Sequence, residues 1–158
     1  MENHLPKRKS TRLKNFDYSN NGYYFITICT YERRKILSKI VGEGLRALPI
    51  IELTAIGEKV NKAINFINVH YGNISVDKYI IMPDHIHMII KIETGGHGDP
   101  PLQIQDVIGG FKSFTTHEFG KTLWQRSFYD HVIRNQNDYR EIWEYIENNP
   151  YKLLEKSR

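Results

Sequence analysis

The segment SVDKYIIMPDHIHMIIKI, residues 75–92, predicts two β-strands joined by a tight turn. Isoleucine, valine and tyrosine are frequent in residues 75–82 and 85–92, as is typical of strands. Only Pro83 and Asp84 separate the two runs, which favours an antiparallel hairpin. We therefore expect a β-sheet that contains this hairpin.

Strand and helix signals alternate on both sides of the hairpin. Thr54 is a typical helix N-cap residue, and apolar residues recur at helical spacing from there to Gly72. Residues 36–53 mix glycine, proline and short apolar runs, which predicts a hairpin or an irregular excursion. The other expected elements are a strand over 23–30, a helix from Pro101 to Gly120, a strand over 123–133, and a helix over 138–149 closed by Pro150.

The order strand, helix, strand, strand, helix, strand, followed by one more helix, is the split βαβ plan. It predicts an α+β fold with a ferredoxin-like, RRM-like antiparallel sheet, helices on one face, and a C-terminal helix that carries a tyrosine. A chain of 158 residues suits one core. We expect a basic N-terminal arm over residues 1–20 and a single catalytic domain over residues 21–158.

Composition restricts the class of protein. No run approaches the roughly 18 apolar residues of a membrane span, and no secretion signal is visible at the N-terminus. The single cysteine, Cys29, excludes an intramolecular disulfide and a cysteine zinc cluster. These features predict a soluble cytoplasmic protein with no membrane contact.

Basic residues are concentrated near the N-terminus and interleave with aromatic residues. Lys and Arg number 22 against 18 Asp and Glu, so the mild excess permits a polyanionic partner. The alternative for the first cluster is a solvated tail. The candidate DNA-binding residues are Lys7, Arg8, Lys9, Arg12, Lys14, Arg33, Arg34, His131 and Arg134.

His85 and His87 are two residues apart in the second strand of the hairpin. Because alternate side chains share a face, both imidazoles point the same way about 7 Å apart and can converge on one metal ion or phosphate. The alternative is a pair of solvent-facing histidines. His131 has two interpretations as well, as a DNA contact or as an ordinary sheet residue, whereas Trp124 is interpreted as a core residue rather than a base-stacking platform.

Tyr145 and Asn149 are four residues apart and share one face of the final helix. The alternative is an ordinary helix tyrosine and a C-terminal cap. Taken with the histidines, they suit phosphoryl transfer: a divalent ion held by His85, His87 and Asn149 polarises a phosphodiester, and Tyr145 attacks the phosphorus. Arg134 or Lys152 would assist ionisation of the tyrosine.

Three segments, in order, resemble the HUH single-tyrosine transposases, particularly the REP-associated tyrosine transposases. They are MPDHIHMII (82–90), LWQRSFYDHVIRN (123–135) and DYREIWEYIENNP (138–150). The resemblance implies metal ligands at His85, His87 and Asn149 and a nucleophile at Tyr145. It also implies cleavage of single-stranded DNA beside a hairpin, without ATP, which leaves a 5′-phosphotyrosine and a free 3′-hydroxyl.

The resemblance implies a divalent cofactor, Mg²⁺ or Mn²⁺, of which Mn²⁺ accepts imidazole more readily. The resemblance does not decide between a monomer and a homodimer, because it extends to relatives of both kinds. The short connection over 135–138 favours a monomer. The alternative function is a catalytically silent ferredoxin-like module that binds RNA or DNA, or a domesticated remnant.

Overall fold

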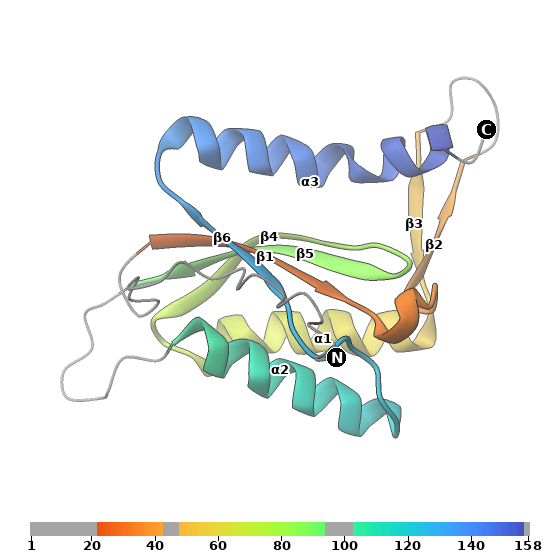
Figure 1. Ribbon diagram of the computed structural model, residues 1–158, viewed down its shortest axis with the longest axis horizontal. Helices are drawn as coiled ribbons and strands as arrows, with labels where there is room; N and C mark the ends of the chain where they lie inside the picture. Colours follow the sequence, from red (N-terminus) through yellow and green to blue (C-terminus); the bar gives the residue numbers. More distant parts are fainter. Residues whose placement is uncertain (1–21, 43–47, 94–102, 157–158) are drawn as a thin grey trace, which may run out of the picture.

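The computed structural model describes residues 22–42, 48–93 and 103–156. Four antiparallel strands form the main sheet in the order β4-β5-β1-β6. Helices α1 and α2 cover one face and α3 the other (Figure 1). This arrangement confirms the predicted split βαβ fold. The strands are β1 (Gly22–Cys29), β4 (Ile74–Ile81), β5 (His85–Ile92) and β6 (Tyr129–Ile133).

The two faces of the sheet have different cores because side chains alternate along each strand. The larger core lies under α1 and α2 and includes Tyr24, Ile26 and Ile28 of β1. A smaller core under α3 contains Phe25, Ile89, Ile133 and Ile146. The strand residues whose side chains point away from the larger core therefore lie on the face under α3.

Helix α1 (Ala55–His70) begins where predicted, because the Thr54 side chain accepts a hydrogen bond from the Gly57 amide at 3.0 Å. A Cβ at Gly57 would lie 1.9 Å from the Leu37 carbonyl oxygen, so this contact requires glycine. Helix α2 (Ile104–Phe119) ends at Gly120, whose φ of 83° is left-handed. Its described start is Ile104, and Pro101 lies outside the described residues.

Residues 36–53 contain the second, smaller sheet. Strands β2 (Ser38–Val41) and β3 (Ile50–Leu53) pair antiparallel, which confirms the hairpin interpretation of this segment. The Ser38 hydroxyl donates a hydrogen bond to the Ile81 carbonyl at 2.9 Å and so ties the hairpin to the end of β4. A one-turn 3₁₀ helix, η1 (Tyr31–Arg33), connects β1 to this hairpin.

Two boundary predictions are wrong. The strand expected over 123–133 is only β6, because Trp124 forms an isolated bridge with Thr30 before the chain turns away. The last helix does not end at Pro150: α3 (Gln136–Lys156) continues through it. Pro150 removes one helical hydrogen bond, but it is buried, and Leu154 packs 3.1 Å from the Cβ position at Gly42.

Residues 1–20, the predicted basic arm, lie outside the described residues. The same holds for its five candidate DNA contacts, Lys7, Arg8, Lys9, Arg12 and Lys14. The division into an arm and a domain over 21–158 therefore stays a prediction. In the described part of the chain, no helix is long and apolar enough to cross a membrane.

Candidate functional site

A cavity of about 730 Å³ opens between the sheet and α3. Its lining includes His85, His87, Tyr145 and Asn149, the four residues for which sequence predicts catalytic or metal-binding roles. The histidines come from β5, whereas Tyr145 and Asn149 come from α3. The fold thus brings together residues that are about 60 positions apart in the sequence.

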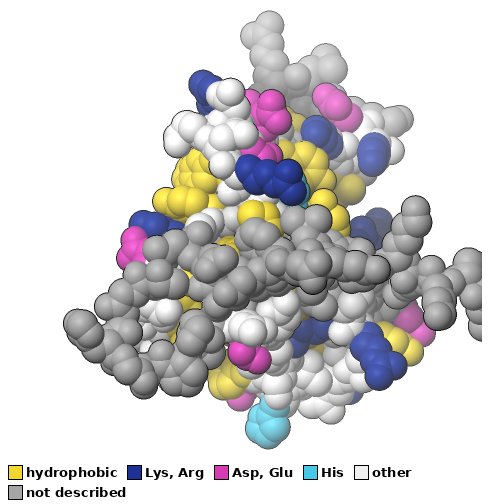
Figure 2. All heavy atoms as spheres, turned by 60° about the vertical axis from the view of Figure 1, so that its left-hand side comes forward, with side chains coloured by type: hydrophobic (Ala, Val, Ile, Leu, Met, Phe, Trp, Pro, Cys, Tyr) yellow, Lys and Arg dark blue, Asp and Glu magenta, His cyan; other side chains and the backbone are white. Residues whose placement is uncertain are grey.

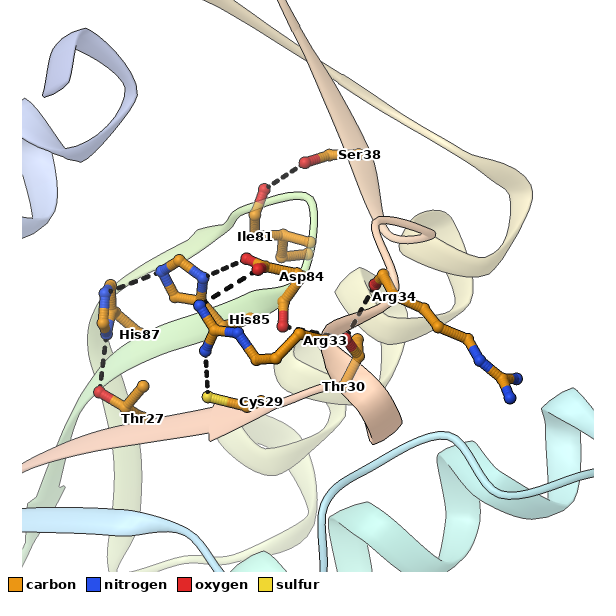
Figure 3. A network of polar contacts seen from close by, with 10 residues as sticks. All are labelled: Thr27, Cys29, Thr30, Arg33, Arg34, Ser38, Ile81, Asp84, His85 and His87. Carbon is orange, nitrogen blue, oxygen red and sulfur yellow. Dashed lines mark hydrogen bonds and ion pairs between the residues drawn. The ribbon is translucent and has the colours of Figure 1, made fainter. Parts of the chain in front are cut away.

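The two imidazoles converge on one point (Figure 3). Their Nε2 atoms lie 3.1 Å apart. On the other side of each ring, Nδ1 of His85 lies 2.7 Å from the Asp84 carboxylate, and Nδ1 of His87 lies 2.7 Å from the Thr27 hydroxyl. An ionised carboxylate only accepts, so His85 carries its proton on Nδ1 and presents a lone pair at Nε2. With His85 Nε2 as the acceptor, His87 donates from its Nε2 across the 3.1 Å contact, and its Nδ1 accepts a hydrogen bond from the Thr27 hydroxyl. Because a hydroxyl also accepts, the Thr27 contact can persist when the His87 proton moves to Nδ1 and leaves Nε2 free for a cation.

The histidines are not solvent-facing, so that alternative is wrong. His87 is 4% exposed, because α3 covers this face of the sheet. Burial is the main cause that lowers the pKa of His85, opposed by Asp84. Burial, with the nearby charges of His85 and Arg33, lowers the pKa of His87 to about 3. Both rings are therefore neutral, and able to bind a cation, at neutral pH.

The lowered pKa of His87 makes stability depend on pH. Unfolded His87 takes up a proton near pH 6.5, whereas folded His87 stays neutral down to about pH 3. The unfolded state therefore binds more protons between these values, and stability falls as pH falls. We expect His87 to contribute up to about 1.4 kcal/mol per pH unit to this slope. Urea unfolding of metal-free protein from pH 7.5 to 4 should show a shallower slope for His87→Gln, and equal slopes would contradict this assignment.

The donor set fits a divalent cation. Two nitrogens bound at about 2.1 Å to one ion, at the right angle of an octahedral site, lie about 3.0 Å apart. The observed Nε2 separation of 3.1 Å matches this spacing. No group of three His, Cys, Asp or Glu side chains in the described residues forms a metal site, so a third protein ligand has to be another kind of oxygen donor, such as an amide.

Asn149 is in position to be that ligand. It is buried inside α3 rather than capping its end, which corrects the alternative interpretation. A hydrogen bond with Asn149 raises the pKa of His85, although burial outweighs it. Asn149 also lines the cavity, so its carboxamide lies beside the histidine pair.

Tyr145 stands beside the histidines and remains accessible. Its ring centroid lies 5.3 Å from that of His87 and 6.0 Å from that of Phe25, and the residue is 41% exposed. The Lys152 ammonium lies 4.8 Å from the Tyr145 ring centroid. Tyr139 differs: its hydroxyl donates to Asp77 at 3.1 Å, and burial with this bond raises its pKa to about 12. Tyr139 is a packing residue, whose ring centroid lies 5.1 Å from that of Tyr23.

The other candidate DNA contacts separate into two groups. Arg33 and His131 line the cavity, and His131 Nε2 lies 2.9 Å from the Asp138 carboxylate. Arg34 points away from the histidines and pairs with Glu32 at 3.2 Å (Figure 3). Arg134 precedes α3 and does not line the cavity. Helix α3 begins at Gln136, and Tyr145 lies nine residues, about 13 Å, further along it, which separates Tyr145 from Arg134. Of the two basic residues predicted to assist the tyrosine, Lys152 is therefore the one that lies near it.

The side chains that hold the imidazoles were not among the predicted site residues. Asp84 was recognised only as a turn residue, although its place directly before His85 was a usable signal. Thr27 gave no local signal, because it meets His87 only through the β1–β5 register. Trp124 is a core residue, as predicted: it is 4% exposed and its indole donates to Thr115 at 2.7 Å.

Charge around the site is mixed in sign. At the height of α3, Figure 2 shows Lys and Arg side chains interspersed with Asp, Glu and hydrophobic side chains. The cavity itself is lined by three basic residues, Arg33, Lys152 and Lys156, against two carboxylates, Asp84 and Asp138. The small positive balance is therefore local to the cavity and suits an anionic ligand.

Comparison with known proteins gives full-length and partial relatives. An uncharacterised protein of Haemophilus influenzae is 30% identical over 164 residues, which span 90% of this chain and 88% of that protein. The two chains belong to one family. A REP-associated tyrosine transposase of Escherichia coli is 33% identical over 78 residues, 49% of this chain and 44% of that protein. A scan against protein-family models finds no match.

A solved structure shares the fold. It is described as a REP-associated tyrosine transposase bound to a REP hairpin, and it is 24% identical with a TM-score of 0.66. The match covers 89% of this chain and 73% of that chain. The resemblance to REP-associated tyrosine transposases that the three sequence segments predict is thereby confirmed.

Proposed function

From its resemblance to REP-associated tyrosine transposases, we propose that this protein is a metal-dependent enzyme that nicks and rejoins single-stranded DNA beside a hairpin. One observation carries the proposal: two imidazole Nε2 atoms 3.1 Å apart share a cavity with an accessible tyrosine and a buried amide. A domain that only binds nucleic acid has no need for this convergence.

The chemistry is one phosphoryl transfer. The Tyr145 hydroxyl loses its proton and its oxygen attacks the phosphorus, and the bond from phosphorus to the 3′ oxygen breaks. The 3′ oxygen leaves as a hydroxyl once protonated, and the 5′ phosphate stays on the tyrosine. Phosphoester bonds are exchanged one for one, so the reverse attack rejoins DNA without ATP. A bound divalent ion, held by His85, His87 and Asn149, would polarise the phosphate.

The side chains of the cavity prepare this step. Asp84 and Thr27 fix the two imidazole rings so that both Nε2 atoms face the cavity. Lys152 places a positive charge beside the Tyr145 ring in the same cavity, which favours an anionic substrate there. Phe25 packs against both the His87 and the Tyr145 rings and holds them at a fixed spacing.

The direct test is a denaturing gel with a REP hairpin oligonucleotide that has randomised single-stranded flanks, in Mn²⁺. A 5′-phosphotyrosine retains the DNA on the 3′ side of the nick. We therefore expect a 3′ label to migrate with protein in SDS and a 5′ label to appear on a shorter free fragment. Retardation on a native gel with no cleavage and no adduct would instead favour the binding module.

We also propose that the site is completed within one chain. Only residues 134–135 separate β6 from α3. The helix buries Ile146 against its own sheet, and Lys78 of β4 pairs with Glu147 and lies over the Trp143 ring. A mixture of Tyr145→Phe and His85→Ala/His87→Ala proteins should therefore stay inactive. Recovered cleavage in the mixture would show that tyrosine and histidines come from different subunits.

A further inference from the structure

Arg33 reaches the cavity through an unusual turn. Glu32 has φ 56° and ψ 22°, and Arg33 has φ 54°, so two successive residues with side chains are left-handed. Such conformations are strained for residues with a Cβ and tend to occur at functional sites. A right-handed turn would direct the Arg33 side chain elsewhere, so this backbone is what delivers the guanidinium to the cavity.

The turn is held in place by Thr30, which is fully buried. Its amide donates to the Asp84 carbonyl at 2.9 Å, and the Arg33 amide donates to the Thr30 carbonyl at 3.0 Å. The Thr30 hydroxyl lies 2.8 Å from the Arg34 carbonyl and 3.1 Å from the Asp84 carbonyl, so it shares its one proton between the two turns. The strained turn and the turn that carries Asp84 therefore form one rigid unit (Figure 3).

The guanidinium is anchored but not saturated. Its Nη2 lies 3.1 Å from the Asp84 carboxylate, and its Nη1 donates to the Cys29 sulfur at 2.7 Å. These are its polar partners among the described residues. Arginine has five N–H donors, and the Arg33 side chain is 51% exposed. The group is thus oriented by two contacts while other donors remain open to a ligand in the cavity.

The Arg33 guanidinium lies next to the imidazole pair. It lines the same cavity, and its Nη2 shares the Asp84 carboxylate with Nδ1 of His85. A fixed cation next to a cation-binding pair is unfavourable on its own. The guanidinium and a cation bound by the histidines would repel each other, and an anion between them would remove that repulsion. The arrangement therefore matches a phosphate oxygen between Arg33 and the histidine pair.

We propose that Arg33 binds a non-bridging oxygen of the scissile phosphate and stabilises the charge that develops there during attack by Tyr145. This inference rests on the proposed function of the site. Arg34 provides the contrast: it follows directly in sequence, but its guanidinium pairs with Glu32 and lies over the Tyr31 ring, away from the cavity.

The test is a cycle between protein and DNA. The wild-type adduct assay first locates the scissile phosphate. Binding is then measured without metal, in a Tyr145→Phe background, to that oligonucleotide and to one with a methylphosphonate at that phosphate, which removes its charge. We expect Arg33→Gln to weaken binding of the natural DNA by about 10-fold or more and of the methylphosphonate DNA by less than about 2-fold. Arg34→Gln should act equally on both.

Two results would overturn the inference. One is an equal loss for Arg33→Gln on both oligonucleotides. The other is a loss of Mn²⁺ affinity in DNA-free Arg33→Gln protein, because Arg33 would then act by positioning Asp84 and His85. If wild-type protein forms no adduct, the proposed function fails and the inference falls with it. If wild-type protein forms the adduct but Arg33→Gln and Arg34→Gln bind the two oligonucleotides in the same way, the inference on Arg33 is rejected and the proposed function stands.

Discussion

A Tyr145→Phe variant is expected to form no covalent adduct and to cleave the hairpin oligonucleotide at least about 10³-fold more slowly than wild type. Only the phenolic oxygen is removed. The ring contacts with His87 and Phe25 remain, so the fold and the DNA affinity should change little. The adduct gel measures the first effect, and a native gel titration measures the second.

Tyr151→Phe is the matched control, because Tyr151 lies on the same helix and is similarly exposed, at 43% against 41%. It should form adduct at the wild-type rate. Adduct that persists in Tyr145→Phe would assign the nucleophile elsewhere. Tyr139 is then a poor candidate, because its hydroxyl is engaged by Asp77 and its pKa is raised to about 12 by burial and that bond.

Replacing either histidine by alanine should lower the rate of metal-dependent cleavage about 10²-fold or more, since each contributes one of the two convergent nitrogens. The two variants should differ in stability. His85→Ala opens the edge of the cavity, whereas His87→Ala leaves a hole beneath α3 and should cost about 1–3 kcal/mol. Cleavage against Mn²⁺ concentration and urea unfolding separate the two effects.

His87→Leu guards against simple unfolding, because leucine refills much of the space beneath α3 but has no atom that can bind a metal. His131→Ala is the matched control: it removes an imidazole that lines the same cavity but is bonded to Asp138. Full cleavage by a well-folded His87→Leu protein, with an unchanged dependence on Mn²⁺, would refute the metal-ligand assignment.

Local patterns were sufficient to predict the hairpin and its histidines. The run over 85–92 coincides with β5, and a two-residue turn leaves little freedom in how the strands pair. The Tyr145 and Asn149 pair followed from helical spacing alone. In these segments the information lies within a few residues, so sequence is enough.

Long-range packing decided what sequence reasoning missed. Thr27 and His87 are 60 residues apart, and nothing near Thr27 marks it as a partner. Helix α3 continues past Pro150, where Leu154 lies close to Gly42 at the end of β2, more than 100 residues earlier in the sequence. Local rules end the helix there, and so they also miss Lys156 at the cavity.

The alternation along β5 has a consequence for how this segment can change over generations. Ile86 and Met88 belong to the large core, and His85 and His87 belong to the cavity. One inserted or deleted residue in this strand would exchange the two sets, placing imidazoles in an apolar interior and aliphatic side chains in the cavity. The turn at Pro83 and Asp84 has no spare residue to absorb the shift. Homologous proteins can therefore differ in sequence along β5, whereas a change in the length of this segment would disrupt both the core and the cavity.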